Sequence, residues 1–272
     1  MTETSGFAIT DQEFALFQKL IYKIAGIALS DAKKVLLVGR LGKRLKHYNF
    51  TSFGQYYRYL ATGENPEELQ TMVDLLTTNE TYFFREPQHF DFLRDVALKA
   101  PRTGPPFRVW SGASSTGEEG YSMAMTLAEA LKDAPWEVFG SDISQTVLAK
   151  ARAGVYSLER TDGIPPELLK KYCMKGVRSQ EGRLMISPQL RERVTFAQVN
   201  LTLPITGVGD FDVIFLRNVM IYFDQETKRK VVENMLPFLK PHGFFIVGHS
   251  ESLNGITNKV QAVRPTIYRK AS

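Results

Sequence analysis

The sequence has 272 residues, and 43% of them are hydrophobic, which is enough for the core of one large domain or two smaller ones and argues against a disordered chain. Its single cysteine, Cys173, excludes an internal disulfide, and its four histidines (His47, His89, His242 and His249) have no spacing typical of a zinc or di-metal site. The net charge of +5 suits nucleic acid, an anionic membrane surface or an acidic protein equally well, so it excludes none of these partners.

The N-terminus has no features of a targeting segment. Residues 1–14 contain no basic segment followed by an apolar core, and no stretch of the chain approaches the roughly 20 apolar residues of a membrane span. We therefore expect a cytoplasmic protein in a reducing compartment, with no structural metal and no membrane insertion.

Helical patterns fill the first part of the chain. Thr10 and Glu13 have the spacing of a capping box, at the start of a helix that is expected to end near Gly26. Two further helical patterns lie between residues 51 and 79. Residues 1–78 are therefore expected to form an all-helical N-terminal domain.

Another helix is expected at about residues 31–48, with two opposed faces. Its apolar face is expected to contain Val35, Val38, Leu41 and Leu45. Its basic face is expected to contain Lys33, Arg40, Lys43, Arg44 and His47. Such a basic face can be ordinary solvated surface, or it can dock an acidic helical bundle.

After a joint rich in proline and glycine, short apolar runs alternate with helical patterns. We expect strands at residues 107–111, 136–141, 194–199, 211–216, 243–248 and 260–268, the first five of them buried on both faces. This alternation predicts an α/β fold with a doubly wound, mostly parallel sheet.

Residues from about 154 to 193 break the pattern, and a turn at residues 180–182 predicts a small antiparallel β-subdomain there. The expected layout is a helical domain (1–78), a linking segment that contacts the cofactor (79–106), and a catalytic domain (107–272) that carries this insertion.

Acidic residues follow the first two strands of the expected sheet. In open parallel sheets, ligands bind beyond the carboxyl ends of the strands. The loop after the first strand, "SGASSTGEEG", is rich in small residues but ends in Glu118 and Glu119, which disfavour a pyrophosphate and favour a cation. Asp142 ends the second strand, where an acid can accept hydrogen bonds from ribose hydroxyls. A ribose and a positive charge without phosphate describe S-adenosylmethionine.

Structural roles also account for these acids. The two glutamates lie in the first turn of a helix, where the helix dipole favours acids. Asp142 and Ser144 can together cap the helix that follows.

Three further segments point to a family. They are "TTNETYFFRE" (77–86), "LRNVMIYFD" (216–224) and "GHSESL" (248–253). Together with "STGEE" and "DIS", they make the chain resemble the CheR-type chemotaxis receptor methyltransferases over nearly its whole length. The resemblance implies a class I, Rossmann-like methyltransferase that uses S-adenosylmethionine to esterify glutamate side chains on the cytoplasmic helices of chemoreceptors.

The resemblance also implies a set of site residues. It implies Asn79, Thr81 and Arg85 at the cofactor's amino-acid portion, Glu118 near its ammonium, Asp142 on the ribose, Asn200 and Leu201 at the adenine, Asn218 and Val219 beside the sulfonium, and Tyr222 near the methyl group. Arg85 and Tyr222 are the candidates for orienting the acceptor carboxylate and lining the methyl path. Arg85 can instead hold the cofactor's carboxylate or bridge two domains, and Tyr222 can be a half-buried tyrosine at a strand end. Phe83 and Phe84 are expected to be packing residues.

The expected partner is the helical cytoplasmic bundle of a chemoreceptor, docked on Lys33, Arg40, Lys43 and Arg44. We expect a monomer that does not bind nucleic acid. A nucleic-acid methyltransferase is the first alternative, but the segment after the fourth strand lacks the Asn/Asp-Pro-Pro-aromatic pattern of amine-methylating enzymes, and Cys173 lies in the insertion, away from any strand end. The second alternative is a binding module that senses the cofactor without catalysis.

Overall fold

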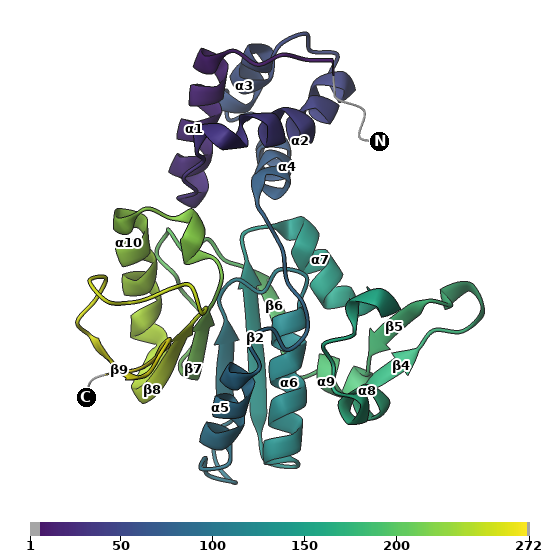
Figure 1. Cartoon of the computed structure of the whole chain (residues 1–272), viewed down its shortest axis with the longest axis vertical. Coiled ribbons are helices and arrows are strands. Elements are labelled where there is room, and N and C mark those ends of the chain that lie inside the picture. Colours follow the sequence, from purple (N-terminus) through teal and green to yellow (C-terminus); the bar gives the residue numbers. More distant parts are fainter. Residues whose placement is uncertain (1–5, 271–272) are drawn as a thin grey trace. The chain divides into compact units, whose positions relative to one another are not determined.

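The computed structural model describes residues 6–270 and divides them into two compact units (Figure 1). The helical unit contains the described residues up to Thr78 together with Tyr222–Thr227, and the sheet unit contains Asn79–Ile221 and the described residues from Lys228 onward. Within residues 6–270, no helix combines the length and apolar character needed to cross a bilayer.

The helical unit is built from four α-helices. They are α1 (Asp11–Ala25), α2 (Lys34–His47), α3 (Phe53–Ala61) and α4 (Pro66–Leu76), and a 3-10 turn, η1 (Asp31–Lys33), precedes α2. The predicted capping box is confirmed, because the Glu13 amide donates to Thr10 Oγ1 at 3.1 Å and the Thr10 amide donates to Glu13 Oε2 at 2.9 Å. The helix ends at Gly26, whose φ of 69° is in the left-handed region that glycine favours.

The predicted apolar face of α2 is confirmed at Leu41 and Leu45, but its phase is wrong at Val35. Val35 is 81% exposed, and Leu37, Leu41 and Leu45 form the buried stripe instead. At 100° per residue Val35 lies about 200° from Leu37, on the opposite side of the helix. The same change of phase turns Arg44 towards the interior of the unit.

The sheet unit contains a seven-stranded sheet whose order is β6-β2-β1-β7-β8-β10-β9. The strands are β1 (Phe107–Ser111), β2 (Trp136–Asp142), β6 (Val194–Gln198), β7 (Phe211–Leu216), β8 (Leu239–Val247), β9 (Val260–Arg264) and β10 (Ile267–Lys270). The first five are mutually parallel, and β10 is antiparallel to both β8 and β9. This confirms the predicted doubly wound, mostly parallel sheet.

Two details of the strand prediction are wrong. Residues 260–268 are not one strand, because the chain turns back at Pro265 and Thr266 to form the β9–β10 hairpin. Thr266 has a φ of 63° in this turn. The strand β6 is not buried on both faces either. It lies at the edge of the sheet, where Thr195 and Gln198 are exposed.

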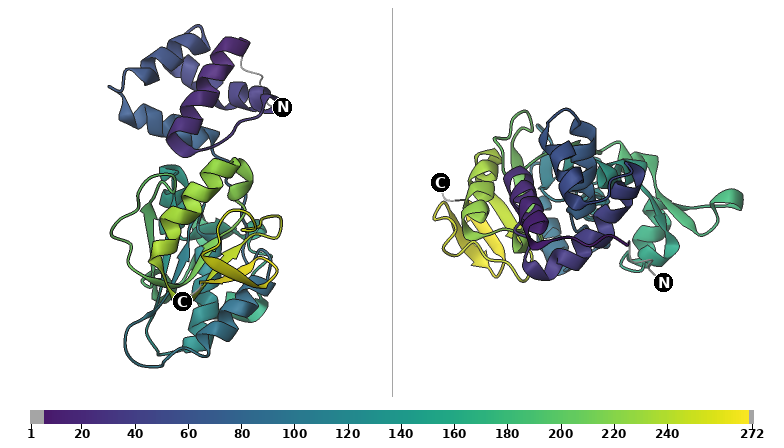
Figure 2. Two further views of the ribbon diagram at one scale, coloured as in Figure 1. Left: turned by 90° about the vertical axis from the view of Figure 1, so that its left-hand side faces the viewer. Right: turned by 90° about the horizontal axis from the view of Figure 1, so that it is seen from above.

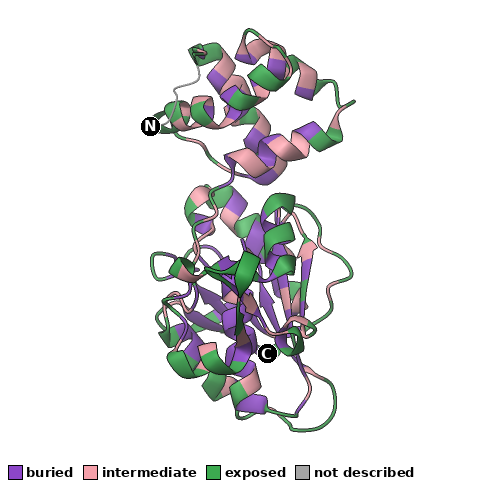
Figure 3. Ribbon diagram, turned by 90° about the vertical axis from the view of Figure 1, so that its right-hand side faces the viewer, coloured by how far each residue is buried: buried purple, intermediate pink, exposed green. Residues whose placement is uncertain are grey.

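Helices cover both faces of the sheet. The helices of this part of the chain are α5 (Gln88–Ala97), α6 (Glu118–Leu131), α7 (Gln145–Ala153), α8 (Pro166–Tyr172), α9 (Pro188–Arg191) and α10 (Gln225–Met235). On one face, Val109 of β1 and Leu127 of α6 belong to the same buried cluster. On the other face, the ring of Trp110 packs against Phe238, in the turn that follows α10, with ring centroids 6.2 Å apart. The left panel of Figure 2 shows α10 in front of the strands, and Figure 3 shows the strands as the buried layer.

The helix α5 lies inside the segment that the sequence predicted as a linker. Phe90, Leu93 and Ala97 are buried along one side of it and join the core of the sheet unit. Their three- and four-residue spacing is a helical signal, but Pro87 precedes the helix and no side chain caps it.

The predicted antiparallel β-subdomain is present. Its three strands are β3 (Val155–Ser157), β4 (Cys173–Lys175) and β5 (Arg183–Ile186), in the order β3-β5-β4. The predicted turn at residues 180–182 lies between β4 and β5, which pair directly. The short helices α8 and α9 complete the subdomain.

Candidate active site

The ends of β1, β2 and β7 lie side by side, because the three strands are parallel neighbours. Backbone hydrogen bonds hold the loop after β1 against both neighbours. The Gly112 amide donates to the Phe215 carbonyl of β7 at 2.8 Å, and the Ser114 amide donates to the Ser141 carbonyl of β2, also at 2.8 Å. The loop that the sequence singled out is therefore fixed at the carboxyl edge of the sheet.

Two glycines of this loop have different roles. Gly117 has a φ of 96° and forms the N-cap of α6, as a tight turn requires. A Cβ at Gly112 would lie 2.7 Å from the Met235 side chain and 3.2 Å from the Phe215 carbonyl oxygen. Gly112 therefore allows close packing against β7 and α10.

Asp142 connects the loops after β1 and β2. Its Oδ2 accepts from the Ser115 amide at 2.9 Å, and its Oδ1 accepts from the Ser144 amide at 3.0 Å. The side chain of Ser144 caps α7, as the structural alternative expected. These contacts hold the carboxylate at the end of β2, in the position that dinucleotide folds use to bind a ribose.

Glu118 is completely buried at the first turn of α6. Its Oε2 accepts from the Thr116 hydroxyl at 2.6 Å, and its Oε1 lies 2.9 Å from Nη2 of Arg160. This contact is close enough for an ion pair, but its direction is not that of a hydrogen bond, so Oε1 has no hydrogen-bond donor. Burial raises the pKa of Glu118, and this favours a cationic partner over water.

Glu119 has a different environment from Glu118. Its carboxylate accepts from the Ser111 hydroxyl at 2.7 Å and from Nη1 of Arg217 at 2.8 Å. Burial raises the pKa of Glu119, while Arg217 acts in the opposite direction. The neighbouring acids therefore face two separate cations.

A buried guanidinium links three segments of the sheet unit. The side chain of Arg217, at the end of β7, is 1% exposed. It donates to Glu119, to Glu86 Oε2 at 2.9 Å, and to the carbonyl of Arg85. Despite the opposing effect of burial, Arg217 holds the pKa of Glu86 at about 2, so this carboxylate is ionised.

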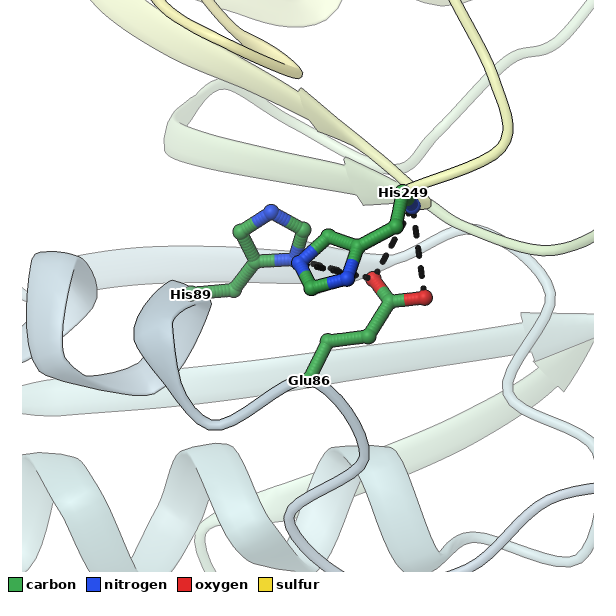
Figure 4. Close-up of side chains that lie close together, drawn as sticks. All are labelled: Glu86, His89 and His249. Carbon is green, nitrogen blue, oxygen red and sulfur yellow. Dashed lines mark hydrogen bonds and ion pairs between the residues drawn. The ribbon is translucent and has the colours of Figure 1, made fainter.

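Glu86 also lies beside two histidines (Figure 4). It accepts from the His249 amide at 3.2 Å, and its Oε2 lies 3.3 Å from Nδ1 of His89. Burial, and then the charge of Arg217, lower the pKa of His89 to about 4, so this imidazole is neutral at pH 7. Its Nε2 is 2.8 Å from the hydroxyl of Thr266.

Glu86, His89 and His249 offer ligand atoms within 4.8 Å of one another. Histidine and carboxylate ligands suit zinc and other transition metals. However, the guanidinium of Arg217 already neutralises Glu86 and disfavours a second cation. Glu86 therefore belongs to an ion-pair network with Arg217, and the two histidines lie beside it. The sequence spacing of the histidines gave no sign of this arrangement.

Glu251 organises the loop after β7. Its Oε2 accepts from the amides of Asn218 and Gly248 at 2.7 Å each, and its Oε1 accepts from the Met220 amide at 2.8 Å. Asn218 has a φ of 57°, and a Cβ at Gly248 would lie 2.6 Å from the Asn218 side-chain nitrogen. The "GHSESL" motif therefore fixes the conformation of the predicted sulfonium-binding loop.

The segment that contains Asn79, Thr81 and Arg85 runs past the loop after β1. The Asn79 carbonyl accepts from the Ser115 hydroxyl at 2.9 Å, and the Thr81 carbonyl accepts from Arg160 at 3.0 Å. The Arg85 side chain donates to the Glu80 carbonyl at 3.2 Å, and its guanidinium lies 5.6 Å from the ring of Tyr82.

The predicted packing roles of Phe83 and Phe84 are confirmed. The ring of Phe83 is 1% exposed and meets Tyr156 edge to face at 4.9 Å, and the ring of Phe84 packs on Phe90.

The remaining predicted residues lie in different environments. Asn200, after β6, accepts from the amide and hydroxyl of Thr202, and Leu201 is buried. Val219 is half-buried, directly after Asn218. Tyr222 belongs to the helical unit, whereas the other predicted catalytic and cofactor-binding residues belong to the sheet unit.

The four predicted docking residues form two pairs. Lys33 and Lys43 are exposed. Arg40 donates to the carbonyls of Leu75 and Thr77 at the end of α4, at 3.1 and 2.8 Å. Arg44 binds Glu68 with two nitrogens. The expectation of one solvated basic face is therefore wrong for Arg40 and Arg44, because both stabilise the packing of α2 on α4.

Acidic and polar groups at the ends of β1, β2 and β7 fit S-adenosylmethionine. Asp142 is held at the end of β2, the loop after β1 is fixed by its backbone, and Glu118 has a buried oxygen that contacts Arg160 but accepts no hydrogen bond. These groups match a ribose and an ammonium, and the acids disfavour a phosphate.

Comparisons with known proteins agree with this cofactor. The "CheR methyltransferase, all-alpha domain" matches residues 12–77, and the "CheR methyltransferase, SAM binding domain" matches residues 79–269. The chemotaxis protein methyltransferase of Escherichia coli is 42% identical over 268 residues, which cover 97% of this chain and 93% of that protein. Chemotaxis protein methyltransferase 2 of Pseudomonas aeruginosa is 40% identical over 268 residues, which cover 97% of this chain and 95% of that protein. The chain therefore belongs to the CheR methyltransferase family, and it is a chemotaxis methyltransferase that uses S-adenosylmethionine.

Proposed function

We propose that the chain transfers the methyl group to glutamate side chains on the cytoplasmic helices of chemoreceptors and so forms methyl esters for sensory adaptation. The observation that supports the cofactor part of this proposal most directly is the position of Asp142 at the end of β2 and of Glu118 at the start of α6, after the loop that follows β1, which suits a cofactor that carries a ribose and a positive charge. The cofactor supplies an electrophilic methyl group when it is bound.

Each of the predicted cofactor-binding residues has a proposed task. Asp142 accepts hydrogen bonds from the ribose, and Glu118 binds the ammonium. Asn200 and Leu201 contact the adenine, while Asn218 and Val219 lie beside the sulfonium. Asn79 and Thr81 contact the amino-acid portion.

Arg85 and Tyr222 are proposed to meet the acceptor. Arg85 orients a carboxylate, either that of the acceptor glutamate or that of the cofactor, through the paired donors of its guanidinium. Tyr222 lines the path of the methyl group.

The acceptor needs no general base from the protein. A glutamate with an ordinary pKa of about 4.3 is ionised at pH 7, so its oxygen is already a nucleophile. Positioning then supplies most of the rate, and effects of this kind contribute on the order of 7–11 kcal/mol. Cys173 is not suited to covalent catalysis, because burial raises the pKa of its thiol to about 11.

Labelled S-adenosylmethionine distinguishes the candidate acceptors. The full chain is incubated with a receptor cytoplasmic fragment, with the same fragment whose acceptor glutamates are changed to alanine, and with RNA. We expect label on the first fragment only, released by mild base as esters are. Label on RNA, or base-stable label on the fragment, would contradict glutamate esterification.

The exposed Lys33 and Lys43 are proposed to attract the acidic receptor bundle through long-range electrostatics. The proposed setting is the cytoplasm, and the proposed form is a monomer. The helical domain is proposed to supply docking, and residues 107–272 are proposed to supply catalysis.

A further inference from the structure

Arg160 connects the β-subdomain to two of the proposed cofactor-binding segments. It is the last residue of a 3-10 turn, η2 (Leu158–Arg160), which directly follows β3. A single nitrogen, Nη2, lies 2.9 Å from Glu118 Oε1 and 3.0 Å from the Thr81 carbonyl oxygen. One guanidinium therefore bridges the segment of residues 79–86 and the first turn of α6.

The backbone around Arg160 is held in place. The hydroxyl of Tyr156, in β3, donates to the Thr116 carbonyl at 2.8 Å, two residues before Glu118. The Leu158 amide donates to the Gly182 carbonyl at 3.0 Å, which ties the turn to the rest of the subdomain. The turn that carries Arg160 is therefore tied both to the loop before α6 and to the rest of the subdomain.

The two partners of this ion pair differ greatly in burial. Glu118 is fully buried, whereas the side chain of Arg160 is 50% exposed. The guanidinium can rotate into water at little cost, but the carboxylate cannot leave its position. Oε2 of Glu118 already accepts from Thr116, whereas Oε1 accepts no hydrogen bond, so Oε1 is the oxygen with more capacity for a cation.

We propose that Arg160 competes with the ammonium of the cofactor for Glu118, so that the β-subdomain sets cofactor affinity through this ion pair. The inference rests on the proposed ammonium-binding role of Glu118. Arg160 must exchange its contact with Glu118 when the amino-acid portion of the cofactor binds there. A change in the subdomain that withdraws Arg160 therefore tightens cofactor binding.

Calorimetric titration of the full chain with S-adenosylhomocysteine tests the proposal. The variants are Arg160→Gln, Glu118→Gln and the double variant, and the matched control is Arg183→Gln, an exposed arginine of the same subdomain. A second titration uses the analogue of S-adenosylhomocysteine that lacks the amino group. The titrations are carried out at mildly alkaline pH, so that the Glu118 carboxylate is ionised and Arg160 does not compete with a proton for it.

We expect Arg160→Gln to bind S-adenosylhomocysteine roughly fivefold more tightly than the unaltered chain, in line with the loss of one competing ion pair. Arg183→Gln leaves the affinity unchanged. The gain disappears with the deaminated analogue and in the Glu118→Gln background. Weaker or unchanged binding by Arg160→Gln, or an equal gain with both ligands, would overturn the proposal.

The methyl-transfer assay with receptor fragments is scored separately. If adding Glu118→Gln to Arg160→Gln leaves the affinity for S-adenosylhomocysteine unchanged, the ammonium-binding role fails and the competition proposal fails with it, because no Arg160 contact is then present to offset the loss. If the affinities behave as expected but no receptor fragment is methylated, the competition stands and the proposed acceptor is wrong.

Discussion

Replacing Asp142 with alanine tests two roles of its carboxylate, which are to hold the backbone of two loops and, as proposed, to bind the ribose of the cofactor. In the structure its carboxylate accepts from the amides of Ser115 and Ser144, at 2.9 and 3.0 Å, and the residue is 8% exposed. Alanine leaves both buried amides without an acceptor, at about 1–3 kcal/mol each, so we expect the sheet unit to lose about 2–6 kcal/mol of stability. Loss of charged hydrogen bonds to the ribose should weaken cofactor affinity by a further 1.5–3 kcal/mol, or roughly 10- to 100-fold.

Two assays distinguish these effects. Urea unfolding followed by tryptophan fluorescence reports on the sheet unit, because both tryptophans, Trp110 and Trp136, lie in its strands β1 and β2. Calorimetry with S-adenosylhomocysteine reports on binding. The control is Ser144→Ala, which removes the cap of α7 and should cost about 1 kcal/mol of stability without changing affinity. If Asp142→Ala binds S-adenosylhomocysteine as tightly as Ser144→Ala, the ribose role of Asp142 is refuted.

Three further predictions concern charge. Arg44→Met leaves Glu68, which is 5% exposed, without its cation, so we expect the full chain to lose about 3 kcal/mol of stability. Chemical unfolding followed by circular dichroism measures this loss. An unchanged unfolding transition would show that Arg44 is not structural. The double variant Lys33→Glu and Lys43→Glu should methylate the receptor fragment more slowly at low salt, with an unchanged affinity for S-adenosylhomocysteine. An equal loss of methylation rate and of affinity would argue against docking. Lowering the pH from 7 to 5 should cost the sheet unit about 2 kcal/mol through His89, whose pKa falls from 6.5 to about 4 on folding, because the unfolded chain then binds more protons. In His89→Gln this part of the pH dependence should be absent from the urea transition, and the exposed His47→Gln serves as the control.

The sequence by itself determined the fold class and the positions of most strands. Apolar runs such as residues 211–216 are too short for helices and too continuous for a half-exposed sheet, so they predict buried parallel strands. The capping box at Thr10 and the acids after β1 and β2 are local signals as well, and they place Glu118 and Asp142 at strand ends without any knowledge of the tertiary structure.

The partners of the charged groups could not be predicted in this way. Arg217 and Glu86 are 131 residues apart and meet only because β7 ends beside the segment that precedes α5. The one available signal was a charged residue directly after the buried run of β7, since a charge in that position requires a partner. Which residue becomes the partner depends on the strand order, and the strand order cannot be predicted from these local signals.

The face of α2 shows the same limit. Periodicity predicted the helix and the burial of Leu41 and Leu45, but packing against α4 decided that Leu37 is buried and Val35 is exposed. Arg44 followed that choice and became the partner of Glu68 instead of a solvated cation. Local sequence determines which elements form, because caps and periodicity act over a few residues. Tertiary structure decides which charges meet, because burial makes an unpaired charge costly and its partner comes from a distant part of the chain.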